Sequence, residues 1–447
     1  RIPTGGGKTW LAAKSVQLVN THLLRSDYSV ILWLVPSNAI RKQTLKCLKD
    51  RQHPYHAALR EAGPVTVIDL EEAKSVSRAT LETSTTVIVS TVQAFKREDT
   101  EGLKVYESNG ALMHHFDGLT SEQRAHLMPD NGSGAIPYSL ANVLRLRRPF
   151  IIVDEAHNNR TELSFETLAR FRPSGIMELT ATPDTEHTPS NVLHSVGAGE
   201  LKAEEMIKLP ILLATEPDAD KCLANAIARR DELHELARQE RQVGANYLRP
   251  VVLIQAEPRR QGVETRDVDW VYARLTGENF GIPADEVVIA TGEARGLDEI
   301  AEKYDKGILD ENCPVKYVIT QRALAEGWDC PFAYILVSMA ELRSSTAVEQ
   351  LLGRILRQPD AQHRHNAALN QSYAFVVSRD FGATAASLQD GLVNSAGFNA
   401  RDAADFVAPA TSEQQHLDFG RPGARAVARP VVVQLPEKPA MRSIPKS

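Results

Sequence analysis

The sequence is poor in the features that mark several classes of protein. It has four cysteines, Cys47, Cys222, Cys313 and Cys330, far apart and without a Cys-x-x-Cys pair, so neither a zinc site nor a disulfide framework is indicated. A reduced, cytoplasmic setting is expected. No apolar run approaches the roughly 20 residues of a membrane span and no signal peptide is recognisable, so no membrane association is expected.

Basic charge is also scarce, since 51 Lys and Arg stand against 57 Asp and Glu for a net charge of -6. This balance excludes a polybasic tail, although a localised nucleic-acid site remains compatible with it because net charge averages over different faces. The remaining composition, 43% hydrophobic and 24% charged, is that of a globular protein. At about 150 residues per domain, the length suggests roughly three domain-sized units.

Short apolar runs alternate with helical or irregular segments along most of the chain. Parallel strands buried on both faces have this character, so the sequence predicts an α/β fold with two doubly wound parallel-sheet domains. The strands are expected at residues 30–35, 65–70, 86–92, 150–153 and 176–180, and then at 251–255, 287–291, 315–320, 334–338 and 373–377.

Three segments depart from this alternation. Residues 97–148 are rich in Gly, His, Asn and Ser and are expected to form a surface insertion. Residues 218–241 carry charges of both signs at helical spacing, which favours a solvated connector helix. Prolines accumulate after residue 400 and predict an extended tail. The expected organisation is a first domain at 1–200, a connector at 201–245, a second domain at 246–400 and a tail at 401–447.

A glycine-rich loop stands at the start of the chain. In such a loop, glycines let backbone N–H groups approach phosphates, while Lys8 can reach the outer phosphates and the Thr9 hydroxyl can ligate magnesium. The full phosphate-loop pattern would have glycine where Ile2 stands, and a Gly-rich turn before a helix is the alternative. The predicted cofactors are ATP and Mg²⁺, and the residues expected to bind them here are Thr4, Gly5, Gly6, Gly7, Lys8 and Thr9.

The chain opens without methionine, and the loop comes so early that no strand can precede it. We therefore expect a fragment of a longer protein.

An acidic pair follows the apolar run at residues 150–153. Asp154 and Glu155 would then lie at the carboxyl end of a buried strand, where α/β sheets bind ligands. Asp154 is predicted to hold magnesium near the phosphates, and Glu155 to orient or deprotonate a water molecule. Solvated acids in a turn are the alternative, but the glycine-rich loop upstream in the same domain favours NTP hydrolysis.

Several segments, taken in order, resemble the motifs of superfamily 2 helicases of the DEAD/DEAH-box type. Residues 3–9, 154–157 and 180–183 resemble motifs I, II and III. The further matches are residues 35–37 to motif Ia, 90–93 to the next nucleic-acid motif, 326–331 to motif V and 350–357 to motif VI. The loop Pro-Thr-Gly-Gly-Gly-Lys-Thr together with Glu-Gly-Trp-Asp is most similar to the helicase part of type III restriction endonuclease Res subunits.

The resemblance implies two RecA-like domains with ATP between them. Arg354 and Arg357 are three residues apart on an expected helix, so both guanidinium groups can point at a γ-phosphate, with Gln350 one turn earlier to sense it. A solvated basic helix face is the alternative. By similarity, further residues would line the nucleotide, namely Gly327 and Asp329, or couple hydrolysis to domain closure, namely His157, Thr180 and Thr182.

Short polar residues after strands are candidates for nucleic-acid contact. Ser37, Thr91, Gln93 and Thr291 could hold phosphates without reading bases, although such residues are ordinarily turn formers.

The sequence predicts an ATP-dependent DNA helicase or translocase, the motor part of a Res-like protein, whose partners are duplex DNA and a modification methyltransferase. The alternatives are a helicase acting on RNA or repair intermediates and a nucleic-acid-binding fragment with little ATPase activity. No nuclease activity is expected, because neither lysine after residue 357, Lys438 or Lys446, has an acidic residue two positions before it.

Overall fold

The structure is a computed structural model. It describes residues 1–3, 5–95, 104–130, 134–154, 162–181, 183, 190–259, 262, 265–291, 296–321, 330–339, 355–394, 398, 403 and 406–410. Residues 1–409 form one unit by their internal contacts. In this described part, no helix has the length and apolar character needed to cross a membrane.

The first half of the chain forms a five-stranded sheet in which all strands are parallel, in the order β2-β3-β1-β4-β5. Every strand expected in this half is present, with ends displaced by one residue at most. The strands are β1 (Val30–Val35), β2 (Val65–Asp69), β3 (Thr85–Thr91), β4 (Phe150–Asp154) and β5 (Gly175–Leu179).

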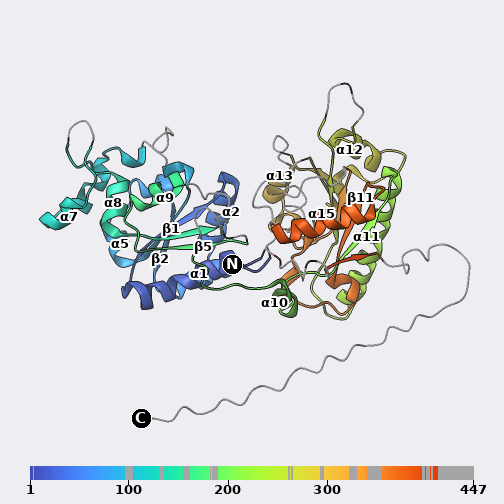
Figure 1. Ribbon diagram of the computed structural model, residues 1–447, viewed down its shortest axis with the longest axis horizontal. Coiled ribbons are helices and arrows are strands. Elements are labelled where there is room, and N and C mark those ends of the chain that lie inside the picture. Colours follow the sequence, from blue (N-terminus) through green and yellow to red (C-terminus); the bar gives the residue numbers. More distant parts are fainter. Residues whose placement is uncertain are drawn as a thin grey trace, which may run out of the picture. The chain divides into compact units, whose positions relative to one another are not determined.

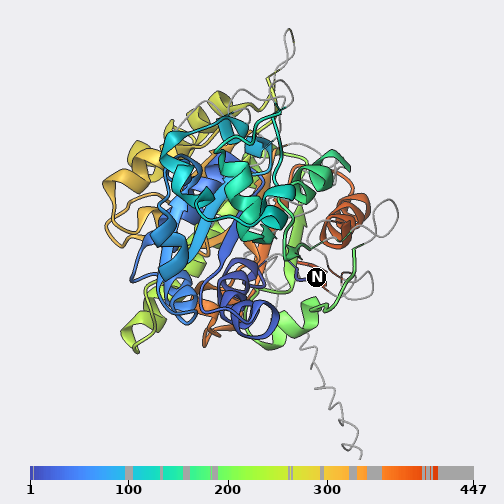
Figure 2. The ribbon, with the colours of Figure 1, turned by 90° about the vertical axis from the view of Figure 1, so that its left-hand side faces the viewer.

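Helices cover both faces of the first sheet, because the strands are apolar on both sides (Figures 1 and 2). Ile31 and Trp33 belong to the cluster that includes α1 (Lys8–Leu18), α2 (Asn38–Lys49) and α3 (Pro54–Arg60). Their neighbour Leu32 belongs to the cluster on the other face. That cluster includes residues of α4 (Leu70–Ala73), α5 (Arg78–Thr83), α8 (Leu140–Arg147) and α9 (Glu162–Ala169).

The region expected to be an insertion contributes to this second cluster. Its described elements are η3 (Gly110–Phe116), α7 (Ser121–Ala125) and α8, and Leu112 and Leu144 pack against the apolar face of the first sheet. The remaining short elements of the first half are η1 (Val19–Leu24) and η2 (Gln93–Phe95).

The second half forms a seven-stranded parallel sheet in the order β12-β6-β11-β10-β7-β9-β8. The five expected strands are present, and two more are added at one side. The strands are β6 (Ile211–Thr215), β7 (Val251–Gln255), β8 (Val287–Ile289), β9 (Tyr317–Thr320), β10 (Ala333–Ser338), β11 (Ser372–Val376) and β12 (Val407–Pro409).

The helices of this half pack on its strands. They are α10 (Ala198–Ala203), α11 (Ala219–Gln242), α12 (Val268–Thr276), α13 (Gly296–Lys303) and α15 (Phe381–Asn394). The short elements are η5 (Ala284–Glu286), η6 (Gly307–Leu309), η7 (Pro359–Ala361) and η8 (Ala367–Asn370).

Residues 201–245, expected to be a connector, contribute structure to the second sheet. β6 pairs with β11 and β12, and α11 packs on β7, β10 and β11. The expectation of a solvated helix is corrected in particular, because Leu223 and Leu233 of α11 are buried in the core of the sheet.

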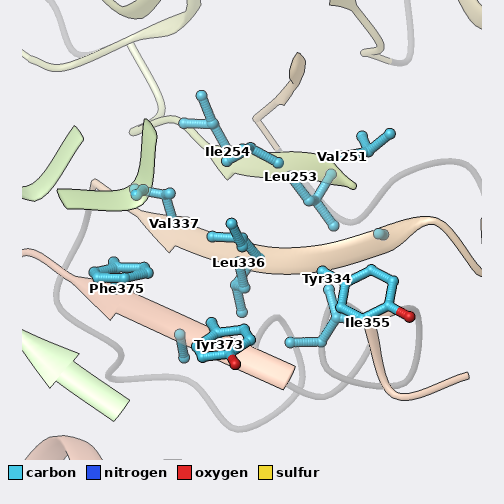
Figure 3. Packing of buried hydrophobic residues seen from close by; sticks show 14 of the residues in the cluster. Val251, Leu253, Ile254, Tyr334, Leu336, Val337, Ile355, Tyr373 and Phe375 are labelled. Carbon is cyan, nitrogen blue, oxygen red and sulfur yellow. The ribbon is translucent and has the colours of Figure 1, made fainter. Parts of the chain in front are cut away.

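The core of the second sheet is built from β7, β10 and β11 (Figure 3). Tyr334 and Tyr373 are almost completely buried, and each hydroxyl donates to a backbone carbonyl, that of Leu369 and that of Ala368 respectively. Ile355, shown with them in Figure 3, belongs to the same cluster. The segment around residue 355 is thereby fixed to the sheet, which positions Arg357 two residues later.

Candidate functional site

The glycine-rich loop has a backbone that requires glycine. Gly5 and Gly7 have φ of 89° and 70°, in the left-handed region that other residues avoid. Gly7 directly precedes α1, and a Cβ built on Gly6 would lie only 2.4 Å from Ile2 Cγ2. The first turn of α1 carries no acidic residue that would oppose an anion at the positive end of the helix dipole.

Asp154 and Thr9, 145 positions apart in sequence, meet beside this loop. Thr9 Oγ1 donates to Asp154 Oδ2 at 3.2 Å. Asp154 is the last residue of β4, and it and Lys8 are buried, with 6% and 7% of their surface exposed. The structure therefore brings together Thr9 and Asp154, the two side chains predicted to hold the metal, and Lys8 adjoins Thr9 in the chain.

This donor set fits Mg²⁺. The ion takes oxygen ligands, and it is usually bound by one or two carboxylates together with substrate phosphates and water. The hydrogen bond between Thr9 and Asp154 places a hydroxyl and a carboxylate oxygen side by side. Among the described residues no group of three or more His, Cys, Asp or Glu could hold a metal, so a metal that relies on protein ligands alone is not indicated there.

The first residues of the chain join the loop to the end of β5. Ile2 N donates to Thr180 O at 3.0 Å, and Arg1 Nε donates to Ala181 O at 3.1 Å. Thr180 is buried directly after β5. The residue predicted to couple hydrolysis to domain closure thus lies beside the segment that leads into the phosphate loop.

The sheet order separates two groups of predicted residues along one edge. Ser37 follows β1 and Thr91 ends β3, whereas Asp154 and Thr180 belong to the ends of β4 and β5. All four strands are parallel, so these residues share the carboxyl edge, with the nucleic-acid candidates on one half and the nucleotide candidates on the other. Gln93, just after β3, is exposed.

Ser37 also has a local role, as the alternative interpretation of such residues anticipates. Its side chain accepts a hydrogen bond from Ile40 N at 3.4 Å at the N-terminus of α2. Thr91 is 6% exposed.

In the second sheet the candidates lie at opposite edges. Thr291 follows β8 at the carboxyl edge. Arg357 precedes β11 at the amino edge, where it forms an antiparallel bridge with Ile207. The other predicted residues lie outside the described part of the chain: Thr4, Glu155, His157, Thr182, Gly327, Asp329, Gln350 and Arg354.

One residue that the sequence analysis missed is Lys208. It lies three residues before the start of β6, with its side chain fully buried. A signal was present, because this lysine interrupts the apolar stretch at residues 206–212.

Two all-parallel α/β sheets, with a phosphate loop before α1 and an aspartate at the end of β4, define a P-loop NTPase fold with two RecA-like domains. Residues 1–185 match the family described as type III restriction enzyme, res subunit. For that part of the chain, the match confirms the resemblance carried by the motifs up to residue 183, which is that of a helicase-like ATPase motor domain of the Res type. No curated protein sequence matches the chain.

Similar solved structures include restriction enzymes and helicases. The ATP-dependent Type ISP restriction-modification enzyme LlaBIII bound to DNA has 13% identity and a TM-score of 0.48, with 88% of this chain covered. This chain spans 28% of the LlaBIII chain. Dbp5 of S. cerevisiae bound to Gle1 and IP6 has 14% identity and a TM-score of 0.44, covering 93% of this chain and 85% of its own. Mycobacterium smegmatis helicase Lhr bound to ssDNA and AMP-PNP has 16% identity and a TM-score of 0.44, and the similarity covers 87% of this chain and 45% of the Lhr chain.

Proposed function

We propose that this chain is the motor part of a Res-like protein and hydrolyses ATP to ADP and phosphate while translocating on or unwinding duplex DNA. The observation that carries the proposal is the contact between Thr9 and Asp154 at the N-terminus of α1. A simple Gly-rich turn would not require a buried aspartate from a distant strand at this point.

In this proposal each described residue of the nucleotide site has one task. The amides of Gly5, Gly6 and Gly7 and the ammonium of Lys8 bind the phosphates of ATP. Asp154 and Thr9 would hold Mg²⁺, which neutralises phosphate charge when it is bound.

The remaining nucleotide-site assignments follow from the motifs. Glu155 would orient or deprotonate the attacking water, while Arg354, Arg357 and Gln350 would contact the γ-phosphate from the second domain. The further residues proposed are Thr4, Gly327 and Asp329 at the nucleotide, and His157, Thr180 and Thr182 in coupling.

Nucleic acid is proposed to bind at the carboxyl edges of both sheets. Ser37, Thr91 and Gln93 lie on the half of the first edge that the phosphate loop does not use, and Thr291 lies at the carboxyl edge of the second sheet. Backbone amides and small hydroxyls bind sugar-phosphate without sequence preference. The preference for DNA, and a methyltransferase partner, rest on the family match of residues 1–185.

The domain organisation is part of the proposal. Residues 1–200 form the first motor domain. The second begins at β6 rather than at residue 246, because β6 is hydrogen-bonded to β11.

The proposal is tested by the ATPase activity of the Lys8→Ala variant with duplex DNA, single-stranded DNA and RNA. We expect loss of stimulated turnover by about two orders of magnitude, because an electrostatic contact to the reacting phosphates is removed. Lys14→Ala is the matched control, since Lys14 lies on the same helix but pairs with Glu61 at the surface. Turnover in Lys8→Ala equal to that of the control would refute the assignment.

The same assay separates the alternatives. Stimulation by RNA without stimulation by DNA would reassign the substrate. Binding of Mg-ATP and nucleic acid by the wild-type chain without turnover would make it a binding fragment.

A further inference from the structure

Lys208 has a buried amino group in the second sheet with two specific acceptors. Its Nζ donates to Pro331 O at 2.8 Å and to Ala333 O at 2.9 Å. The same Nζ lies 3.8 Å from the centre of the Tyr334 ring. Burial lowers the pKa of the Lys208 amino group well below its usual value of 10.5. In either protonation state the amino group has at least two N–H donors, one for each of the two carbonyls.

The backbone around Lys208 is bound to the segment that carries Arg357. Lys208 N donates to Leu356 O at 2.5 Å, and Gln358 N donates to Met206 O at 3.0 Å, on either side of the bridge between Ile207 and Arg357. Residues 206–208 and 356–358 thus form a short antiparallel pair. The orientation of the Arg357 backbone is set by this pairing.

Ser372 strengthens the same junction. Its Oγ lies 3.1 Å from Lys208 O and 2.9 Å from Ile355 O, and it is completely buried. Ser372 is the first residue of β11, which lies between β6 and β10 in the sheet.

Lys208 therefore spans the amino ends of three neighbouring strands. It precedes β6, its carbonyl meets β11, and its ammonium reaches the start of β10. β6 and β10 are two strand spacings apart, about 9.6 Å. A long side chain ending in several donors can bridge such a gap, whereas an apolar side chain would leave the carbonyls of Pro331 and Ala333 without this donor.

We propose that Lys208 is a positioning residue for ATP hydrolysis, which holds the end of the segment at 326–331 and the Arg357 segment in one fixed arrangement. This inference rests on the proposed function. The two segments are the ones that resemble motifs V and VI, and a guanidinium that acts on a transferring phosphoryl group must be placed to within a fraction of an ångström. Lys208 acts through these segments, since its amino group is directed at Pro331 O and Ala333 O.

The test is Lys208→Met in the full chain, since Met keeps the length and the apolar stem but donates no hydrogen bond. We expect kcat of the DNA-stimulated ATPase to fall by about 10- to 100-fold, as a displacement of about 1 Å would cause. The Kd for Mg-ADP, which lacks the γ-phosphate, should change by less than about twofold. A role in folding alone would not produce this separation.

Arg249→Met is the control for general loss of stability. Arg249 is also buried and donates to the backbone carbonyls of Val315, Asp310 and Ile308, none of which belongs to the two motif segments. We expect its variant to unfold at lower temperature and to keep wild-type kcat at temperatures where it is folded.

Ser372→Ala is a milder variant that decides the matter if Lys208→Met does not fold. It removes one hydroxyl from the junction, and a severalfold lower kcat with unchanged Mg-ADP binding is expected. If Lys208→Met folds, a wild-type kcat in this variant would overturn the inference. If Lys208→Met does not fold, a wild-type kcat in Ser372→Ala would overturn it. An equal fall of kcat in Arg249→Met would do the same. Absence of ATPase activity in the wild-type chain would instead overturn the proposed function. The wild-type measurement comes before any variant is compared, so the two failures can be distinguished.

Discussion

A side chain at residue 2 explains why Gly6 cannot be replaced without a shift of the loop. Ile2 occupies the position where the phosphate-loop pattern would have glycine, and its Cγ2 fills the space beside Gly6. Gly6 N also donates to Pro3 O at 3.1 Å, which closes the turn. At residue 2 the loop thus has a packing contact where the pattern has glycine, and the Ile2 side chain fits only because Gly6 has no Cβ.

Gly6→Ala is expected to weaken Mg-ATP binding at least tenfold, because the new Cβ must displace Ile2 or the loop backbone that faces the phosphates. Isothermal titration calorimetry measures the change. The control is Gly199→Ala in α10, where an added Cβ meets nothing within 4 Å. Adding Ile2→Ala to Gly6→Ala should restore part of the affinity. Unchanged affinity in the single variant would show that the loop does not hold the phosphates.

Asp154→Asn is expected to raise the Mg²⁺ concentration required for half-maximal ATPase activity and to lower the maximal rate about 100-fold, because a metal ligand loses its charge. Asp69→Asn provides the control, since Asp69 also ends a strand of this sheet but caps α4 through Glu72 N at 2.8 Å. A Mg²⁺ titration with the same midpoint in both variants would contradict a metal site at Asp154.

At the scale of elements, a residue between a strand and a helix can both cap the helix and contribute to a proposed binding edge. Ser37 caps α2 and Ser77 caps α5 by accepting from Thr80 N at 3.1 Å, but only Ser37 lies at the edge proposed to bind nucleic acid. Capping by itself contributes about 1 kcal/mol in either case.

Comparison of Ser37→Ala with Ser77→Ala therefore separates capping from binding. Both variants should lose about 1 kcal/mol of stability in urea unfolding. Only Ser37→Ala should lower affinity for DNA, by about 3- to 10-fold, measured by fluorescence anisotropy, and it should leave the salt dependence of binding unchanged because a neutral hydroxyl releases no counterion. Equal DNA affinity in the two variants would leave Ser37 as a cap alone.

The strands could be predicted from sequence where an apolar run is long enough to be buried on both faces, as in β1 and β10. β12 could not, because three residues ending in Pro409 carry too little pattern, and proline is tolerated only at such an edge. α11 was misjudged because Arg230 and Glu240 were counted as solvated charges. They are in fact 4% and 6% exposed.

The same contrast holds for the candidate site. Gly7, Lys8 and Thr9 are adjacent in sequence, and Asp154 follows an apolar strand, so local chemistry is enough to predict them as candidates. Lys208 required the tertiary structure, because its acceptors lie more than 120 positions away at Pro331 and Ala333.

At the scale of the molecule, the two sheets have separate apolar cores. Leu32 belongs to a cluster of the first sheet and Leu336 to that of the second. Each core can be weakened without removing contacts from the other.

Leu32→Ala and Leu336→Ala should each cost about 2–5 kcal/mol, and each should affect mainly its own sheet. Hydrogen exchange in urea, followed by mass spectrometry, can report peptides of β4 and β11 separately. We expect early exchange only in β4 for Leu32→Ala and only in β11 for Leu336→Ala. Identical exchange of both strands in both variants would show that the two sheets unfold as one.

The opposite placement of Thr291 and Arg357 in the second sheet has a mechanical consequence. β8 and β11 are four positions apart in the strand order, about 19 Å at 4.8 Å per strand. Thr291 directly follows β8, and Arg357 lies on the amino-terminal side of β11. A rotation of the sheet by about 10° around an axis along β11 would move the end of β8 by about 3.4 Å, the rise of one nucleotide along a DNA strand. If the chain translocates on DNA as proposed, the width of the second sheet would convert a small rotation near a phosphate into a step of a single base.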